Sequence, residues 1–237
     1  MTHVLSAQAR IVATTRIAIP GLLAMAAFVV LTGLAPAVLF GQHRDPHTVL
    51  EGSATVAVVT AMLLGALQTA GDLQNGMSRA LVLVEPRRLR VLGAQLLVSL
   101  GLGAGVGATA ALLADSTQAA LGRLDLPAAT IVQIGLDTAV AASLYGLLGA
   151  AVGTALRNAP LAACVVVLWN YPLEPFISTL SYNVYIYLPG GARESLVQHV
   201  SAHHYIPPPL IGGLILAGIA SAAALVAALT FSRQDIA

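Results

Sequence analysis

The chain has 237 residues, of which 57% are hydrophobic and 9% charged, and its mean hydropathy is +0.85. A soluble domain carries about 25% charged residues, so this composition excludes a water-soluble globule and indicates a protein embedded in lipid. The net charge is only +1, so no broad basic surface for nucleic acid is expected. All 11 basic residues are arginine, and a chain without lysine has no Walker A loop or Schiff base. We therefore expect no ATP hydrolysis from this chain alone. The sequence also has no nucleophile elbow, HExxH motif or acidic calcium loop, so we expect no other enzymatic activity.

Six long apolar windows predict six membrane-spanning helices, because about 20 apolar residues cross the hydrocarbon core. The windows are continuous and rich in Ala and Leu rather than alternating, which argues against transmembrane strands. We expect one all-α transmembrane domain over residues 1–237, because no segment outside the membrane is long enough for its own core. The predicted spans are 17–40, 52–71, 91–114, 126–156, 158–179 and 206–231, with an inner loop at 72–90 and an outer loop at 180–205.

The first window has one alternative interpretation, a cleaved signal peptide. Arg10 and Arg16 precede the window, and Ala35-Pro36-Ala37 is similar to a cleavage site. The apolar region of such a peptide is usually about 7–15 residues long, and this window has 24. The length favours a spanning helix.

Polar side chains near the inner end of the second window are candidates for the substrate pathway. Gln68 and Thr69 lie there, and either of them could line a pathway or form hydrogen bonds between helices. The sequence leaves both alternatives open.

The predicted inner loop at 72–90 has an amphipathic pattern. Its apolar residues recur at helical spacing and the run ends at Pro86, which predicts a short helix along the inner membrane surface. This helix could bind anionic lipid headgroups or dock on a cytoplasmic partner. Arginines at its end suit either role. The apolar positions are Leu73, Met77, Ala80, Leu81 and Val84.

The fourth window contains an acid and three glycines. Asp137 lies about 16 Å along the helix from Leu126, where an ionisable group costs a few kcal/mol (about 2.5–3.5) and normally faces protein or water. It could carry transport chemistry or bond to a neighbouring helix. Gly146, Gly149 and Gly153 predict close packing of this helix against another.

The fifth window contains two prolines that flank Glu174. Pro172 and Pro175 are expected to bend or break the helix and to free backbone carbonyls. One interpretation places Asn170 and Glu174 on the substrate pathway. The other leaves Glu174 solvated at the outer interface.

Histidines in the outer loop offer a different interpretation. His199 and His203 are one helical turn apart, His204 and Glu194 are near, and a metal-dependent membrane enzyme would use such residues. No third ligand is fixed by the spacing, so a solvated loop is favoured and we expect no metal.

The arginine distribution predicts the orientation of the chain. With a cytoplasmic N-terminus, eight arginines lie inside and three outside, which places both termini in the cytoplasm. The inner set is Arg10, Arg16, Arg79, Arg87, Arg88, Arg90, Arg157 and Arg233, and the outer set is Arg44, Arg123 and Arg193.

Three stretches together resemble the permease subunits of type 2 ABC transporters, which are bacterial exporters of drugs, lipids and polysaccharides. They are Asp72, Gly76, Leu81, Leu83 and Pro86-Arg87-Arg88 after the second span, the glycines of the fourth span followed by Arg157-Asn158, and Tyr187–Ala192 before the sixth span. The family commonly has Glu and Gly-Thr where this chain has Asp72 and Gly76-Met77. The resemblance covers most of the chain in order and topology.

This resemblance implies a permease in the bacterial cytoplasmic membrane, paired with a second permease copy or homologue. A separate ATP-binding cassette subunit would bind MgATP, and no cofactor would bind to this chain. The cargo would be amphipathic or apolar, and the segment around 180–205 could re-enter the outer membrane surface. The implied contacts of the ATP-binding subunit are Asp72, Gly76, Arg79, Leu81, Val84, Glu85, Arg87 and Arg88. The alternative is an ion-coupled secondary transporter or channel that uses Asp137 and Glu174.

Overall fold

The computed structural model describes residues 46–76, 88–120, 127–197 and 207–233, with four further helical positions between 23 and 30. Within these ranges the chain forms helices and no strand, as predicted. The predicted first span at 17–40 lies outside the described residues apart from those four positions. The helices are α3 (Pro46–Gln74), α5 (Arg88–Ala120), α6 (Ala128–Leu156), α7 (Ala159–Leu168), the π-helical η1 (Trp169–Leu173), α8 (Glu174–Leu180), α9 (Tyr182–Tyr185), α10 (Pro189–Val197) and α11 (Pro209–Arg233).

Five helical runs in the described ranges are long and apolar enough to cross a membrane. Their outward surfaces expose large apolar side chains, such as Leu112 at 68% and Leu214 at 65%. So much exposed apolar surface would be a liability in water and is normal in lipid. The structure therefore agrees with a multi-pass membrane protein. The runs are Gly52–Gln74, Leu89–Ala120, Ala128–Leu156, Ala159–Leu180 and Pro209–Ser232.

The helices extend beyond the apolar windows of the sequence. The helix α3 continues through Asp72 to Gln74, and α5 continues through Asp115 to Ala120. A window that stops at the first charged residue underestimates the length of the helix. The helix can continue past that residue where a polar side chain has a hydrogen-bond partner or reaches solvent at the helix end. The predicted outer loop also contains two helices, α9 and α10.

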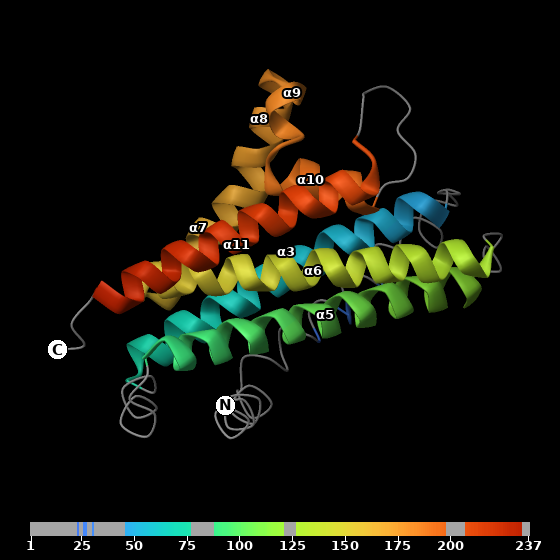
Figure 1. Cartoon of the computed structure of the whole chain (residues 1–237). Helices are drawn as coiled ribbons and strands as arrows, with labels where there is room; N and C mark the ends of the chain where they lie inside the picture. The colour runs from blue at the N-terminus through green and yellow to red at the C-terminus, as the bar shows by residue number, and fades with distance from the viewer. Residues whose placement is uncertain are drawn as a thin grey trace.

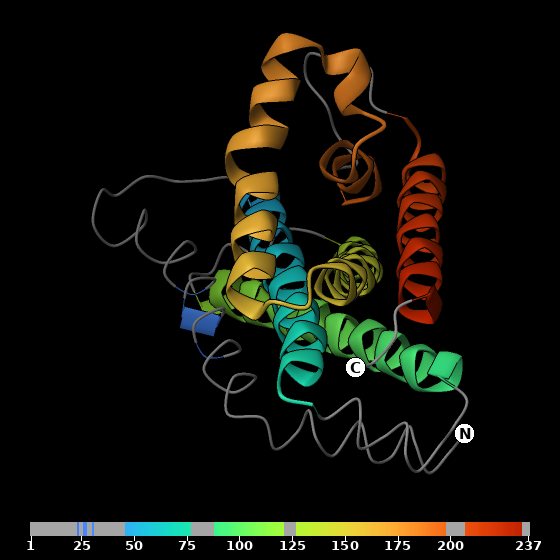
Figure 2. The same ribbon diagram turned by 90° about the vertical axis from the view of Figure 1, so that its left-hand side faces the viewer.

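The long helices lie side by side, with α3 between its neighbours α5, α6 and α7 (Figure 1). On the other side of α6 lies α11, which also contacts α10. Figure 2 shows that the α7–η1–α8 run and α11 are separated, and that α10 lies between them above α6. The short helix α10 is therefore the element that fills the space between the last two spans.

Glycines allow α3, α5 and α6 to pack with their backbones in contact. A Cβ atom on Gly149 would collide with the Met62 carbonyl of α3, and one on Gly146 would lie 2.6 Å from the Ser99 carbonyl of α5. Neither carbonyl can move away without moving its helix. The predicted close approach at these glycines is confirmed, and α6 is the helix that carries it.

The turn between α6 and α7 consists of two residues, each suited to its position. Arg157 adopts a left-handed conformation with φ 52° and closes α6 through its N–H to the Gly153 carbonyl. The Asn158 side chain then caps α7 by accepting a hydrogen bond from the Leu161 N–H at 3.0 Å. Pro160 lies in the first turn of α7, where its missing N–H costs no helical hydrogen bond. The turn is short enough to place α6 and α7 side by side at their ends.

Candidate functional site

One end of the molecule gathers the end of α3, the start of α5 and the α6–α7 turn (Figure 1). The Gln74 side chain at the end of α3 accepts a hydrogen bond from the Ala159 N–H at 3.4 Å. Arg90 on α5 is exposed at this end, and Arg157 in the turn is half-buried. We call this region the arginine-bearing end, defined by Gln74, Arg90, Arg157 and Ala159.

Three of the predicted partner contacts have a described position at this end. Asp72 lies within α3 rather than in a loop, and it accepts a hydrogen bond from the Gln95 side chain of α5 at 3.4 Å. Gly76 has φ +71° just after α3, a conformation that glycine adopts at little cost. Arg88 is the first residue of α5. The contacts predicted at Arg79, Leu81, Val84, Glu85 and Arg87 lie outside the described residues, and all of these contacts stay predictions.

The side chains of Gln68 and its neighbour Thr69 have different hydrogen-bond environments in the structure. Thr69 is fully buried and bonds to backbone carbonyls on its own helix and on α6, so it links the two helices. Gln68 has a buried amide whose nitrogen and oxygen have no hydrogen-bond partner among the described residues. A buried amide without partners costs free energy unless water or another group reaches it.

A π-helical turn carries the chain past the first of the two prolines. Pro172 lies inside η1, and the chain remains helical from α7 through α8. The Asn170 side chain donates to the Val166 carbonyl at 2.9 Å and contacts the Met62 sulfur at 3.4 Å. The prolines therefore perturb the helix without ending it, because a wider π-helical turn accommodates the disturbed backbone.

Glu174 is buried, with 4% of its surface exposed, and it does not face solvent. One carboxyl oxygen, Oε1, accepts hydrogen bonds from the Trp169 Nε1–H and from the Gly190 backbone N–H, both at 2.9 Å. Trp169 belongs to η1 and Gly190 to the first turn of α10. The carboxyl group therefore joins the π-helical turn to α10, an arrangement that the solvated interpretation of Glu174 does not describe.

A second carboxyl group completes this cluster. Glu194 on α10 accepts a hydrogen bond from the Tyr185 hydroxyl at 2.7 Å and lies 3.6 Å from the Arg193 guanidinium. Burial, followed by the charge of Glu194, raises the pKa of Tyr185, so its hydroxyl remains a donor at physiological pH. We define the outer cluster as Trp169, Glu174, Tyr185, Gly190 and Glu194.

Sequence reasoning identified Glu174 but missed the roles of Trp169 and Tyr185. The hydrogen bonds within the cluster join residues that are up to 16 positions apart in the sequence, and no local sequence pattern predicts them. The only local signal is the run Trp169–Leu173 with its proline, which is a composition compatible with an irregular helical turn.

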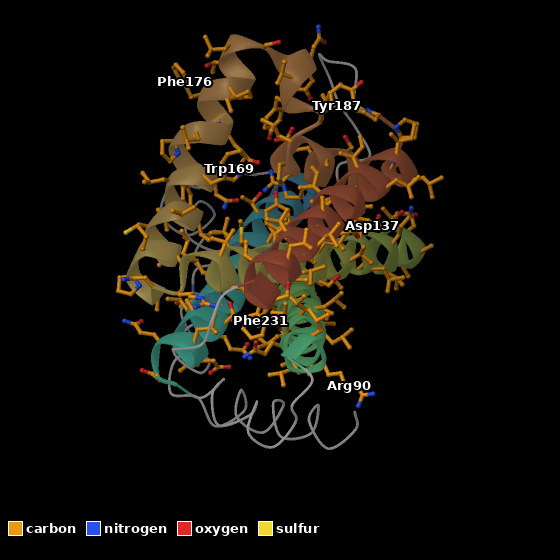
Figure 3. All side chains as sticks on the ribbon, turned by 60° about the vertical axis from the view of Figure 1, so that its left-hand side comes forward. Arg90, Asp137, Trp169, Phe176, Tyr187 and Phe231 are labelled. Atoms are coloured by element: carbon orange, nitrogen blue, oxygen red, sulfur yellow. The ribbon has the colours of Figure 1, made fainter. Side chains whose placement is uncertain are left out.

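Asp137 lies on α6, half-buried and away from the outer cluster. Figure 3 shows its position well separated from Trp169, which is bonded to Glu174. The two acids of the predicted spans are therefore not neighbours in the structure.

The metal interpretation concerned a part of the outer loop that falls outside the described residues. His199, His203 and His204 all lie there. In the described ranges no group of three or more His, Cys, Asp or Glu side chains could hold a metal ion.

No family model matches the chain, and no curated protein is significantly similar to it.

Proposed function

We propose that this chain is the permease subunit of an ATP-driven ABC exporter and that a separate ATP-binding subunit docks on the arginine-bearing end. The observation that carries the proposal is the meeting of α3, α5 and the α6–α7 turn at that end. Residues 77–87 connect α3 to α5 there, so their arginines lie in sequence between Gly76 and the exposed Arg90. This end carries arginines and two connecting segments, residues 77–87 and the α6–α7 turn. Such a surface is suitable for docking of a cytoplasmic partner.

The positive-inside rule supports a cytoplasmic position for this end. Arg90, Arg157 and the final residue of α11, Arg233, lie at it, whereas Arg193 lies in the outer cluster region (Figure 1). With the window at 17–40 as a first span, both termini are cytoplasmic and the chain crosses the bacterial cytoplasmic membrane six times. The helices α9 and α10 then form an outer re-entrant element between the last two spans.

The chain supplies the membrane passage and the partner supplies the energy. A protein without lysine cannot hold ATP phosphates through a Walker A loop, so MgATP binds to the partner, and the assembled complex is the ATP-hydrolysing translocase. Closure of the partner around ATP favours one of two permease states by its differential binding free energy. Two permease chains surround the pathway in this proposal.

The substrate class is amphipathic or apolar, such as a drug, a lipid or a glycan carried on a lipid. The supporting observation is Gln68, whose buried amide has no partner among the described residues and could contact a polar group of the cargo. Asn170 and Thr69 are less available, since their side chains bond to backbone carbonyls.

The ion-coupled alternative receives less support from the same contacts. A proton relay through Asp137 and Glu174 needs acids that exchange protons with each other or with water. Glu174 is buried and accepts two hydrogen bonds, and Asp137 lies away from it. If the relay operated, transport would need no ATPase, and Asp137→Asn and Glu174→Gln would each abolish it.

The proposed function is tested by affinity purification of the tagged chain from membranes of its own host in a mild detergent. We expect a copurifying protein with the sequence G-x-x-x-x-G-K-[ST], and we expect Leu81→Asp and Val84→Asp to lower its yield at least tenfold. The matched control is Val184→Asp, because Val184 is exposed at 54% on α9, at the opposite end from the docking surface.

Each outcome of the purification decides the proposal. Loss of the ATP-binding protein with the inner variants and its retention with Val184→Asp support docking at residues 77–87. Absence of any ATP-binding protein from the wild-type preparation, or equal loss with all three variants, overturns the proposal.

A further inference from the structure

We infer that Glu174 is the positioning residue that ties α10 to the fifth span, and that its role depends on an oxygen acceptor rather than on a negative charge. This inference is independent of the proposed function, because it concerns contacts within the chain. It also assigns to Glu174 a role other than the substrate contact that the sequence suggests.

The tie begins at the first turn of α10. An α-helix leaves the N–H groups of its first turn without partners inside the helix, and Glu174 Oε1 accepts one of them, from Gly190, at 2.9 Å. The same oxygen accepts the Trp169 indole N–H at 2.9 Å. A single atom on α8 therefore joins η1 and α10, which are adjacent in space and separated in sequence.

Glycine at position 190 is required for this contact. A Cβ atom there would lie 2.5 Å from Glu174 Oε2 and 3.2 Å from the Tyr185 hydroxyl oxygen, so the carboxyl group would have to move. At the next position, a Cβ on Gly191 would collide with the Tyr185 carbonyl. The first turn of α10 thus fits against α8 and α9 only with two glycines.

The opposite side of α10 packs against α11. A Cβ atom on Gly212 of α11 would lie 2.5 Å from the Ser195 Cβ and 2.7 Å from the Ala192 carbonyl. Ser195 is buried at 1% exposure, and its hydroxyl donates to the Gly191 carbonyl within α10. The helix α10 is consequently held on one side by Glu174 and on the other by α11.

This double attachment makes α10 a rigid link between the last two spans. Displacement of α8 away from α11 must either carry α10 along or break the bonds at Glu174 Oε1. Removal of the acceptor should release the first turn of α10 and expose its first residue, Pro189, which is buried, while the substitution of a neutral acceptor should not.

The test measures how fast a maleimide labels a cysteine at position 189, in the first turn of α10. The parent is the full chain with Cys164→Ala, which removes the single native cysteine, and with Pro189→Cys, reconstituted in lipid nanodiscs. We expect slow labelling in the parent, labelling at least tenfold faster with Glu174→Ala, and a rate within threefold of the parent with Glu174→Gln. Asp115→Ala, an acid removed from α5, is the matched control and should leave the rate unchanged.

A third variant keeps the test valid if Glu174→Ala is not produced as a folded protein. Gly190→Ala retains the acid but forces the carboxyl group away, and we expect labelling at least tenfold faster than in the parent. Labelling of Glu174→Ala or Gly190→Ala at the parental rate overturns the inference. So does fast labelling of Glu174→Gln, which would mean that the charge is what holds α10.

Discussion

Thr69 on α3 donates a hydrogen bond across the helix interface to the backbone carbonyl of Ala150 on α6, at 3.1 Å. The hydroxyl also lies 2.9 Å from the Gly65 carbonyl of its own helix, so one hydrogen is shared between two helices. The approach is possible because Gly153 has no Cβ, and a Cβ there would collide with the Thr69 hydroxyl. A glycine on one helix and a hydroxyl on the other thus join α3 to α6.

Replacement of Thr69 by valine should weaken this interface. The side chain keeps its shape and loses the interhelical hydrogen bond, for which we expect a loss of about 0.6–1.7 kcal/mol of stability. Thr109→Val is the matched control, because the Thr109 hydroxyl is exposed and bonds only to carbonyls of its own helix. Unfolding titrations with SDS in mixed micelles measure both variants. Equal loss in the two variants would show that the bond to Ala150 contributes nothing.

Replacement of Gly149 by alanine should be more damaging, because the new Cβ meets the Met62 backbone, which cannot rotate away. Overpacking of this kind costs about 1–3 kcal/mol. Gly101→Ala is the control, since a Cβ at Gly101 meets nothing within 4 Å, and alanine is favoured over glycine in a helix by about 0.5–1 kcal/mol. The midpoint of thermal unfolding in detergent should fall for Gly149→Ala and stay level or rise for Gly101→Ala. A fall for both would indicate that the loss comes from helix flexibility rather than packing.

The pattern of small residues and prolines predicted more of the fold than the ionisable residues did. The contacts at Gly146, Gly149 and Gly153 followed from residue size alone, and Pro172 and Pro175 indicated an irregular stretch in the fifth span. Both features are local or depend only on volume. The pairing of Asp72 with Gln95 depends instead on which helices become neighbours, and no spacing along the chain reveals that.

The contacts of the outer cluster likewise could not be predicted from spacing along the chain. Two prolines predicted a bend or break in the fifth span, but a π-helical turn accommodates the perturbed backbone and the chain stays helical. Glu174 fitted both a pathway and a solvated interface as long as its partner Gly190 was unknown. For α10, the sequence predicted only that the segment around 180–205 could re-enter the membrane surface. The helix packs against α11, a later span, and this contact cannot be seen in the segment itself.

The proposed orientation of the chain predicts which positions react from outside the cell. In the Cys164→Ala background, one variant carries Tyr187→Cys, at an exposed position just after α9, and the other carries Ser78→Cys, in the predicted inner loop. A membrane-impermeant maleimide should label position 187 in intact cells and position 78 only after permeabilisation. The reverse pattern would place residues 77–87 outside the cytoplasm and exclude docking of an ATP-binding subunit there.

The Tyr185–Glu194 hydrogen bond should stabilise the outer cluster at neutral pH and less so at high pH. Burial and the nearby Glu194 carboxylate raise the pKa of Tyr185, while an unfolded tyrosine ionises near pH 10. Below about pH 10 both states keep the proton; above it the unfolded chain loses its proton first, so stability falls as pH rises. We expect Tyr185→Phe to cost about 0.5–1.5 kcal/mol at pH 7 and less at pH 11. Unfolding titrations at the two pH values measure this difference, and an unchanged cost at pH 11 would contradict the assignment.

Photocrosslinking at two positions tests most directly whether a separate ATP-binding subunit contacts the arginine-bearing end. A photoreactive amino acid replaces either Leu81 in the inner segment or Val184, which is exposed on α9 at the outer side, and the crosslinked products from living cells are identified by mass spectrometry. The account predicts that position 81, and not position 184, captures a protein carrying G-x-x-x-x-G-K-[ST]. Capture of no nucleotide-binding protein at position 81, with efficient incorporation of the probe, would contradict it.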